Sequence, residues 1–255
     1  ATVTVATPSA FKYKSFFDSE YTNNKALFDS MAASGYGPTY YTFQYALMGT
    51  LSMYEATGDI QYLERTLSWA ETMVSKATVI KGSYKSWSGN WDFYPTNGNP
   101  SASDLEYLQG STELARLAQI IRTNSTLNAT YGTRATAIFN FVHSNIVLRE
   151  VAFAESVRSN VIYATSDKTN MFASILIDMH RAGATLIKSG LSYHDFAVQI
   201  LNNFLSHVSA PTSPDNIAGK GAELWDYKAL TSATYCGTSP NTVSPCSEDT
   251  SHANR

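Results

Sequence analysis

Hydrophobic residues recur every three or four positions along most of the chain, which is the spacing of an amphipathic α-helix. In residues 40–59 the apolar positions are Phe43, Leu47, Leu51 and Tyr54, and a glycine follows at position 58. Glycine often ends a helix because it adopts a left-handed conformation without strain. The pattern therefore predicts a helix that stops at Gly58.

The same helical spacing continues in five later segments and in one earlier segment, and convincing alternating strands are absent after the first few residues. Neighbouring helices are joined by short polar connections, so we expect antiparallel helical hairpins. Hairpins begin near residues 38, 103 and 171, and a fourth would begin near Asp249. The other expected helical segments are 22–34, 60–77, 103–124, 134–151, 170–184 and 193–208.

Alternation of helix direction divides the connections between the two ends of such a stack. Those before residues 38, 103, 171 and 249 emerge at one end, and those before residues 60, 131 and 193 emerge at the other. The first set holds the long segments that are rich in aromatic and polar residues. Long loops gathered at one end of a rigid scaffold usually carry function, so this end is predicted to bind a ligand.

Two aromatic clusters in those loops are typical of sugar-binding surfaces. Indole and phenol rings stack on the C–H faces of sugars, while amides and carboxylates bind the hydroxyl groups. The alternative is that these rings fold over the helix ends and close the core. The candidate residues are Trp87, Asn90, Trp91, Asp92 and Tyr94 of "SWSGNWDFYP", and Glu223, Trp225, Asp226 and Tyr227 of "GAELWDYK".

The last eight residues, "EDTSHANR", combine ionisable and polar side chains where a new helix is expected to begin. Asp249 or Thr250 is a candidate N-cap, and His252 is a candidate base that Glu248 or Asp249 would orient. Asn254 and Arg255 add an amide and a guanidinium, and the first turn of a helix favours a nearby anion. The alternative is a capped helix start without catalytic meaning.

Composition excludes several classes of function. Charged residues make up 15% of the chain, the net charge is −3, and lysine and arginine form no cluster, so a nucleic-acid partner is not expected. No apolar run is long enough to span a membrane. The other histidines, at positions 143, 180, 194 and 207, lie within or at the ends of expected helices and are interpreted as structural. No zinc-binding spacing is present, and no cofactor is expected, although Glu248 and Asp249 leave a calcium site open.

Three features are typical of secreted proteins. Cys236 and Cys246 lie in a loop rich in glycine, proline, serine and threonine, where a disulfide is easily closed. Asn124 and Asn128 begin two glycosylation sequons in one polar connection. The first residues are also what a processed secreted protein would show. An extracellular location is therefore predicted.

Taken together, the helical hairpins, the two aromatic loops and "EDTSHANR" resemble the α/α-toroid carbohydrate-active enzymes, most closely the toroid polysaccharide lyases. The resemblance implies an all-α toroid, or part of one, and cleavage of a uronic-acid polymer by β-elimination. It makes His252 the base, or part of the group with Asn254 and Arg255 that neutralises the substrate carboxylate. Tyr94 or Tyr227 would then be the proton donor, and Asn90 would assist at the carboxylate.

Two other functions remain open on the same scaffold. One is a glycoside hydrolase that uses two carboxylates from Asp92, Asp226, Glu248 and Asp249. The other is a carbohydrate-binding or assembly module without catalysis. The pattern supplies fewer helices than a full toroid has, so residues 1–255 are expected to form one toroid-like domain that is incomplete at its C-terminus. A second chain or a further segment would complete it; the alternative is a smaller arc of the same kind.

Overall fold

The computed structural model describes residues 10–81, 83–88, 105–157, 166–206, 208–209 and 224–225, and these are mostly helical. This agrees with the all-α class predicted from the hydrophobic pattern. The helices are α1 (Ala10–Ala32), α2 (Gly37–Thr57), α3 (Ile60–Lys76), α4 (Leu105–Thr123), α5 (Ser125–Phe141), the π-helix η1 (Val142–Val147), α6 (Leu148–Val157), α7 (Ser166–Arg181) and α8 (Tyr193–Ser206).

Within the described residues, three antiparallel pairs of short strands accompany the helices, and the sequence pattern did not predict them. Each consists of two strands of two to four residues, too short to show a clear alternation of apolar and polar positions. The pairs are β1 (Thr78–Lys81) with β2 (Tyr84–Ser86), β3 (Leu186–Lys188) with β4 (Leu191–Ser192), and β5 (Val208–Ser209) with β6 (Leu224–Trp225).

Local sequence explains where several helices begin and end. Helix α2 ends at Gly58, whose φ of 70° is left-handed and whose N–H donates to the carbonyl of Tyr54 over 2.7 Å. The Asp59 side chain then caps α3 by accepting a hydrogen bond from the Gln61 N–H. Asn124 caps α5 in the same way by accepting from the Leu127 N–H at 3.1 Å. The predicted stop at Gly58 is confirmed.

The prediction of a polar connection around the two sequons is wrong. The structure has only Asn124 between α4 and α5, and residues 125–132 already belong to α5. The cap at Asn124 supports the first turn, and Leu127 and Ala135 are buried against the core. Capping and burial therefore outweigh the modest helix propensity of the serines, threonines and asparagines in this segment.

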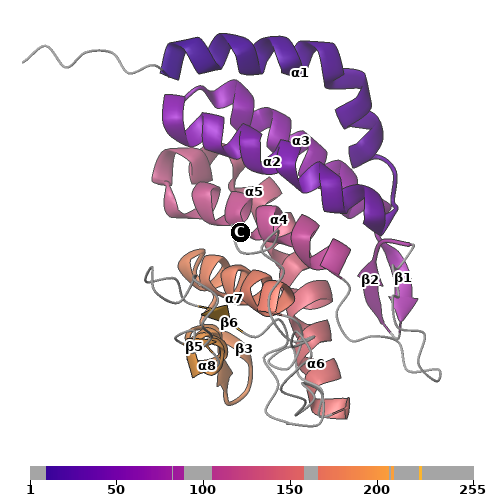
Figure 1. The fold of residues 1–255 in the computed structure, drawn as a ribbon, viewed down its shortest axis with the longest axis vertical. Helices are drawn as coiled ribbons and strands as arrows, with labels where there is room; N and C mark the ends of the chain where they lie inside the picture. The colour runs from indigo at the N-terminus through magenta and orange to yellow at the C-terminus, as the bar shows by residue number, and fades with distance from the viewer. Residues whose placement is uncertain are drawn as a thin grey trace, which may run out of the picture.

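Three helices, α2, α4 and α7, lie in a row through the molecule, because α4 packs against both of the others (Figure 1). Their hairpin partners α3, α5 and α8 pack beside them, α3 also contacts α5, and α1 covers α2 and α3. The predicted antiparallel hairpins are confirmed for the described pairs α2–α3, α4–α5 and α7–α8. Residues at the centre of the core include Phe43, Leu47, Leu63, Leu67, Met73, Leu114, Ile121, Phe172 and Leu176.

Hydrogen bonds between connections confirm the alternation of helix direction where the structure describes it. The Ser88 N–H donates to the Gly35 carbonyl at 3.0 Å, and the Gly37 N–H donates to the Ser88 carbonyl at 2.7 Å. Residues 33–36 and 87–88 therefore share one end, here called the rim end. At the opposite end, the turn end, the Arg122 side chain donates to the Ala182 carbonyl at 2.8 Å.

Among the residues that the structure describes, none of the helices combines the length and the apolar character needed to cross a bilayer.

Candidate active site

Most residues proposed from the sequence lie outside the described part of the chain. Trp225 is described only as part of strand β6, without its side chain. Their roles in catalysis, binding and disulfide formation remain predictions. Those outside are Glu223, Asn90, Trp91, Asp92, Tyr94, Asp226, Tyr227, Cys236, Cys246, Glu248, Asp249, His252, Asn254 and Arg255.

Trp87 is described, and the prediction that it contacts a sugar is wrong in this structure. Its side chain is only 1% exposed, and its indole N–H donates to the Met73 carbonyl at 2.7 Å. The ring packs edge-on against Tyr40, with the ring centroids 4.8 Å apart, and lies near Phe141. The alternative, an aromatic residue that closes the core at the helix ends, describes Trp87 correctly.

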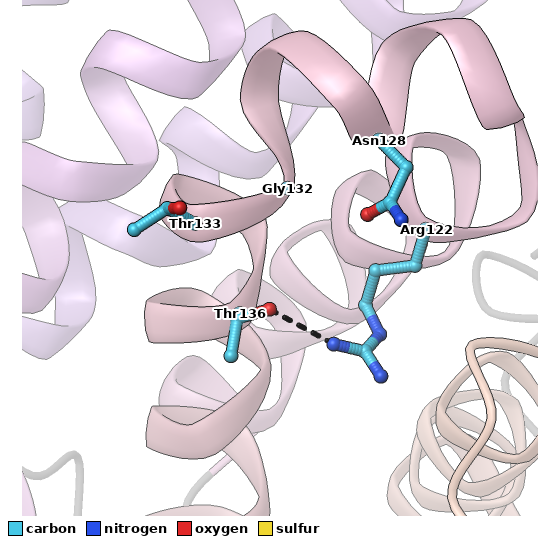
Figure 2. A pocket seen from close by; sticks show the side chains of 5 residues that line it. All are labelled: Arg122, Asn128, Gly132, Thr133 and Thr136. Carbon is cyan, nitrogen blue, oxygen red and sulfur yellow. Dashed lines mark hydrogen bonds between the residues drawn. The ribbon is translucent and has the colours of Figure 1, made fainter.

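The two sequon asparagines are exposed, and Asn128 lines a surface hollow of about 480 Å³ at the turn end (Figure 2). Arg122 lies on the wall of this hollow and donates to the Thr136 hydroxyl at 3.0 Å. Gly132 leaves room for the Asn128 side chain, because a Cβ there would approach its Oδ1 to 2.6 Å. A glycan on Asn128 would cover the hollow, so a glycosylated chain could not bind a ligand there. Glycosylation itself remains a prediction.

A group of charged residues on the three helices of the row forms the strongest candidate site. We call it the carboxylate cluster, and it consists of Glu55 from α2, Glu113 and Arg116 from α4, and Asp178 from α7. Arg116 forms an ion pair with Glu55 and approaches Glu113 more loosely, with 3.4 Å between Nη1 and Oε2. One cation therefore serves carboxylates from two helices.

Burial raises the pKa values of two carboxyl groups in the cluster. Glu113 is 6% exposed, and burial raises its pKa to about 7 although Arg116 opposes the change. Burial likewise raises the pKa of Asp178 to about 6, against the attraction of Arg181 and Arg116. Near pH 7 the cluster thus holds one carboxyl group that is about half protonated and another that is mostly ionised.

Gln109 lies one turn before Glu113 on the same face of α4, since residues four apart are neighbours on a helix. Its side chain is fully buried, yet neither its amide nitrogen nor its amide oxygen has a hydrogen-bond partner in the described part of the chain. A buried amide without partners costs stability. It also offers one donor group and one acceptor to a hydroxyl-bearing ligand.

The sequence reasoning missed these residues because their importance depends on contacts between distant helices. Gln109, Glu113 and Arg116 follow the spacing of one helical face, which is usually solvent-exposed when it is polar. The available signal was that, between residues 108 and 118, every residue other than Gln109, Glu113 and Arg116 is apolar or small. Such a helix is expected to be central to a bundle, and a carboxylate on it is then expected to be desolvated.

The contacts of His143 support its interpretation as a structural residue. Its Nδ1 lies 2.7 Å from the hydroxyl of Tyr193, which is fully buried. Burial lowers the pKa of His143 and raises that of Tyr193, so both side chains favour their neutral forms. This pair joins η1 to the start of α8.

No set of three or more histidine, cysteine, aspartate or glutamate side chains is placed to hold a metal ion in the described residues. Comparisons with protein families, curated proteins and solved structures find no match for this chain. The functional assignment therefore depends on the residues of the chain itself.

Proposed function

We propose that this chain is a saccharide-degrading enzyme that uses Glu113 and Asp178 as a pair of acid and base. The observation that carries the proposal is the raised pKa of two carboxyl groups on neighbouring helices, Glu113, which is buried, and Asp178, which is partly buried. Perturbed carboxyl groups of this kind cluster at catalytic sites, because acid–base catalysis needs pKa values near the working pH. The unpartnered amide of Gln109 beside them suits a substrate rich in hydroxyl groups.

The charge of the cluster favours hydrolysis of a neutral glycan over cleavage of a uronic-acid polymer. The carboxyl groups of Glu55, Glu113 and Asp178 share the positive charges of Arg116 and Arg181. The cluster therefore has no spare positive charge to neutralise a substrate carboxylate, as β-elimination requires. Glycoside hydrolysis needs one protonated carboxyl group and one carboxylate, and the cluster supplies both.

In this proposal Glu113 donates a proton to the glycosidic oxygen, and Asp178 acts as the base or nucleophile. Hydrolysis then requires Glu113 protonated and Asp178 ionised. Activity should fall as the pH drops below about 6, where Asp178 takes up a proton, and as it rises above about 7, where Glu113 loses one. The pH optimum is expected between these values.

In this proposal the hairpin stack is an α/α arc, and the substrate binds along the row formed by α2, α4 and α7. Helices stacked in this way place side chains from successive hairpins on one surface. Secretion belongs to the same proposal and is supported by the two sequons and the two cysteines. Degradation of an extracellular polymer is consistent with both.

β-Elimination by His252 with Tyr94 or Tyr227 is the second candidate. The pairing of Ser88 with Gly35 favours it, because it puts the beginning of one aromatic segment at the rim end. In this alternative the carboxylate cluster has a structural role, and the catalytic residues are those that the resemblance to the lyases implies.

The experiment uses the full chain with neutral polymers such as β-glucan, xylan and mannan, and with the acidic polymers alginate and pectate. We expect new reducing ends from a neutral polymer without the ultraviolet absorbance of an unsaturated sugar. Glu113→Gln should lower turnover by about 100-fold or more, which is typical for loss of an acid catalyst. Glu71→Gln, a substitution on α3 in the exposed pair with Arg134, is the matched control and should retain activity.

Other outcomes would overturn the proposal in distinct ways. Ultraviolet-absorbing products from an acidic polymer would replace hydrolysis by β-elimination. Binding of a polymer without any product would leave a carbohydrate-binding module. Unchanged turnover in a folded Glu113→Gln variant would remove Glu113 from the mechanism.

A further inference from the structure

Two histidines that do not belong to the carboxylate cluster lie together at the turn end. His180 is in the last turn of α7, and His194 is the second residue of α8. Because α7 and α8 form an antiparallel hairpin, the centroids of the two imidazole rings are 5.5 Å apart. Both side chains are exposed, and that of His194 is 62% exposed.

The hydrogen bonds of the two rings fix which nitrogen is free. His180 Nδ1 lies 3.1 Å from the carbonyl oxygen of Ala184, which can only accept, so Nδ1 carries the proton. His194 Nδ1 lies 2.9 Å from a carboxylate oxygen of Asp195 and donates in the same way. In the neutral ring the lone pair is then on Nε2 in both residues. Histidines that bind metals commonly show this arrangement, with the second nitrogen donating to a carbonyl or carboxylate.

The ring separation fits one metal ion held by the two Nε2 atoms. With a metal–nitrogen distance of about 2.1 Å, the ion lies about 3.2 Å from each ring centroid, and a tetrahedral angle then separates the centroids by about 5.2 Å. The observed separation is 5.5 Å. We propose that His180 and His194 bind a divalent transition-metal ion, with Zn²⁺ as the best match, and that water occupies the remaining positions.

Neighbouring charges are compatible with a cation at this place. Asp195 is 80% exposed, and one of its carboxylate oxygens lies 2.9 Å from His194 Nδ1. Asp195 therefore adds a negative charge behind the metal ligand. Arg181 is next to His180 in the chain and opposes binding, so the balance depends on Asp195.

The backbone of the turn holds both ligands in place before the metal arrives. The Ala184 N–H donates to the Met179 carbonyl at 3.0 Å, and the Tyr193 N–H donates to the Thr185 carbonyl at 3.1 Å. The Ser192 hydroxyl accepts from the Asp195 N–H at 2.9 Å at the start of α8. Ligands held in this way lose less conformational freedom on binding. The ion would link α7 to α8.

The experiment is a calorimetric titration of the chelator-treated full chain with ZnCl₂ near pH 7.5. We expect one ion per chain, and each of His180→Ala and His194→Ala should weaken binding at least tenfold. Asp195→Asn should weaken it by about tenfold, as expected for a residue that orients a metal ligand. His207→Ala removes one histidine from the same chain and serves as the control, with unchanged affinity expected.

A second readout needs no substitution. Addition of Zn²⁺ to the wild-type chain should shift the imidazole NMR signals of His180 and His194 and leave those of His143 in place. The proposal is overturned if Zn²⁺ binds without shifting these two signals, or if no binding is detected at millimolar concentration. It is also overturned if a folded His180→Ala variant binds as tightly as the wild type. None of these outcomes depends on the saccharide-degrading activity.

Discussion

The carboxylate cluster and the pair formed by Arg134 with Glu71 use the same residue types in opposite ways. Arg134 on α5 donates two hydrogen bonds of 2.6 Å to Glu71 on α3, and the two side chains are 41% and 38% exposed. In the cluster, Arg116 reaches Glu113 only at 3.4 Å, and Glu113 is almost completely buried. The Arg134–Glu71 pair has short hydrogen bonds and is exposed to water, whereas the Arg116–Glu113 contact is long and Glu113 is shielded from water.

The direction of the pKa changes follows from this difference. The bond to Glu71 raises the pKa of Arg134, so the exposed pair favours its charged form. At Glu113 the cost of burying a charge exceeds the attraction of Arg116, so the carboxyl group favours its neutral form. A nearby arginine therefore does not by itself make a glutamate structural. Burial and geometry decide whether the proton stays available for chemistry.

The largest expected effect is on the pH dependence of stability. The pKa of Glu113 is raised from 4.5 to about 7, so the folded chain keeps a proton that the unfolded chain has released. The free energy of unfolding should therefore fall by about 3 kcal/mol as the pH rises through this window. Urea denaturation at several pH values measures the fall, and Glu113→Gln should remove it.

Asp178 contributes a fall of the same sign that ends near pH 6, because its pKa is raised to about 6. The interval from about pH 6 to about pH 7 therefore isolates Glu113. Glu71→Gln is the control in which the fall should persist. An unchanged slope in Glu113→Gln would contradict the difference drawn between the two regions.

A smaller effect is expected when the arginine of each region is replaced by methionine. Arg116→Met should lower the free energy of unfolding by about 2 kcal/mol at pH 8, because the buried carboxylate of Glu113 loses its cation while the exposed Glu55 stays solvated. Arg134→Met should cost less than about 1 kcal/mol, since water solvates the exposed Glu71. Urea denaturation of the two variants under the same conditions measures both costs.

The cost of Arg116→Met should also shrink at pH 6, where Glu113 is mostly protonated and needs a cation less. Equal costs for the two arginines at pH 8 would show that the cluster is as well solvated as the exposed pair.

The smallest expected effect concerns the buried amide of α4. Gln109→Leu should stabilise the chain by about 1 kcal/mol, because it removes buried polar atoms that have no partner. Substrate affinity should fall in the same variant if the amide binds a sugar hydroxyl. Thermal denaturation and a binding titration measure the two effects.

Gln119→Leu on the same helix is the matched control, since the Gln119 amide donates to the Thr123 hydroxyl and lies near the surface. Its effect on stability should stay within about 0.5 kcal/mol. Destabilisation by Gln109→Leu would mean that the amide has a partner after all.

The helices could be predicted from the sequence because their signals are local. Phe43, Leu47 and Leu51 repeat at helical spacing and are all fully buried, and Gly58 ends the helix that they define. The alternation of the connections followed from counting helices, and the pairing of Gly35 with Ser88 confirms it.

The candidate site could not be predicted, because it depends on long-range neighbours. Nothing near Glu113 in the sequence indicates that Glu55 and Asp178 approach it from two other helices. The prediction for Trp87 failed for the same reason. From sequence alone, a buried tryptophan in a polar loop cannot be distinguished from an exposed one, because its burial depends on contacts with Tyr40 and Met73. Local patterns specify elements, whereas burial is decided by packing.

The π-helix η1 lets one long helical rod keep a single side toward the core. Helices α5 and α6 join through it without a break, so residues 125–157 form one rod. A π-helical turn accommodates one residue more than an α-helical turn, which shifts the phase of every later side chain. Ala135 before the segment and Val151 after it are both buried. An uninterrupted α-helix would place them on nearly opposite sides, whereas the extra residue in the π-helical turn brings them toward the same side. The wide turn therefore corrects the helical phase, so that buried side chains before and after it face the core.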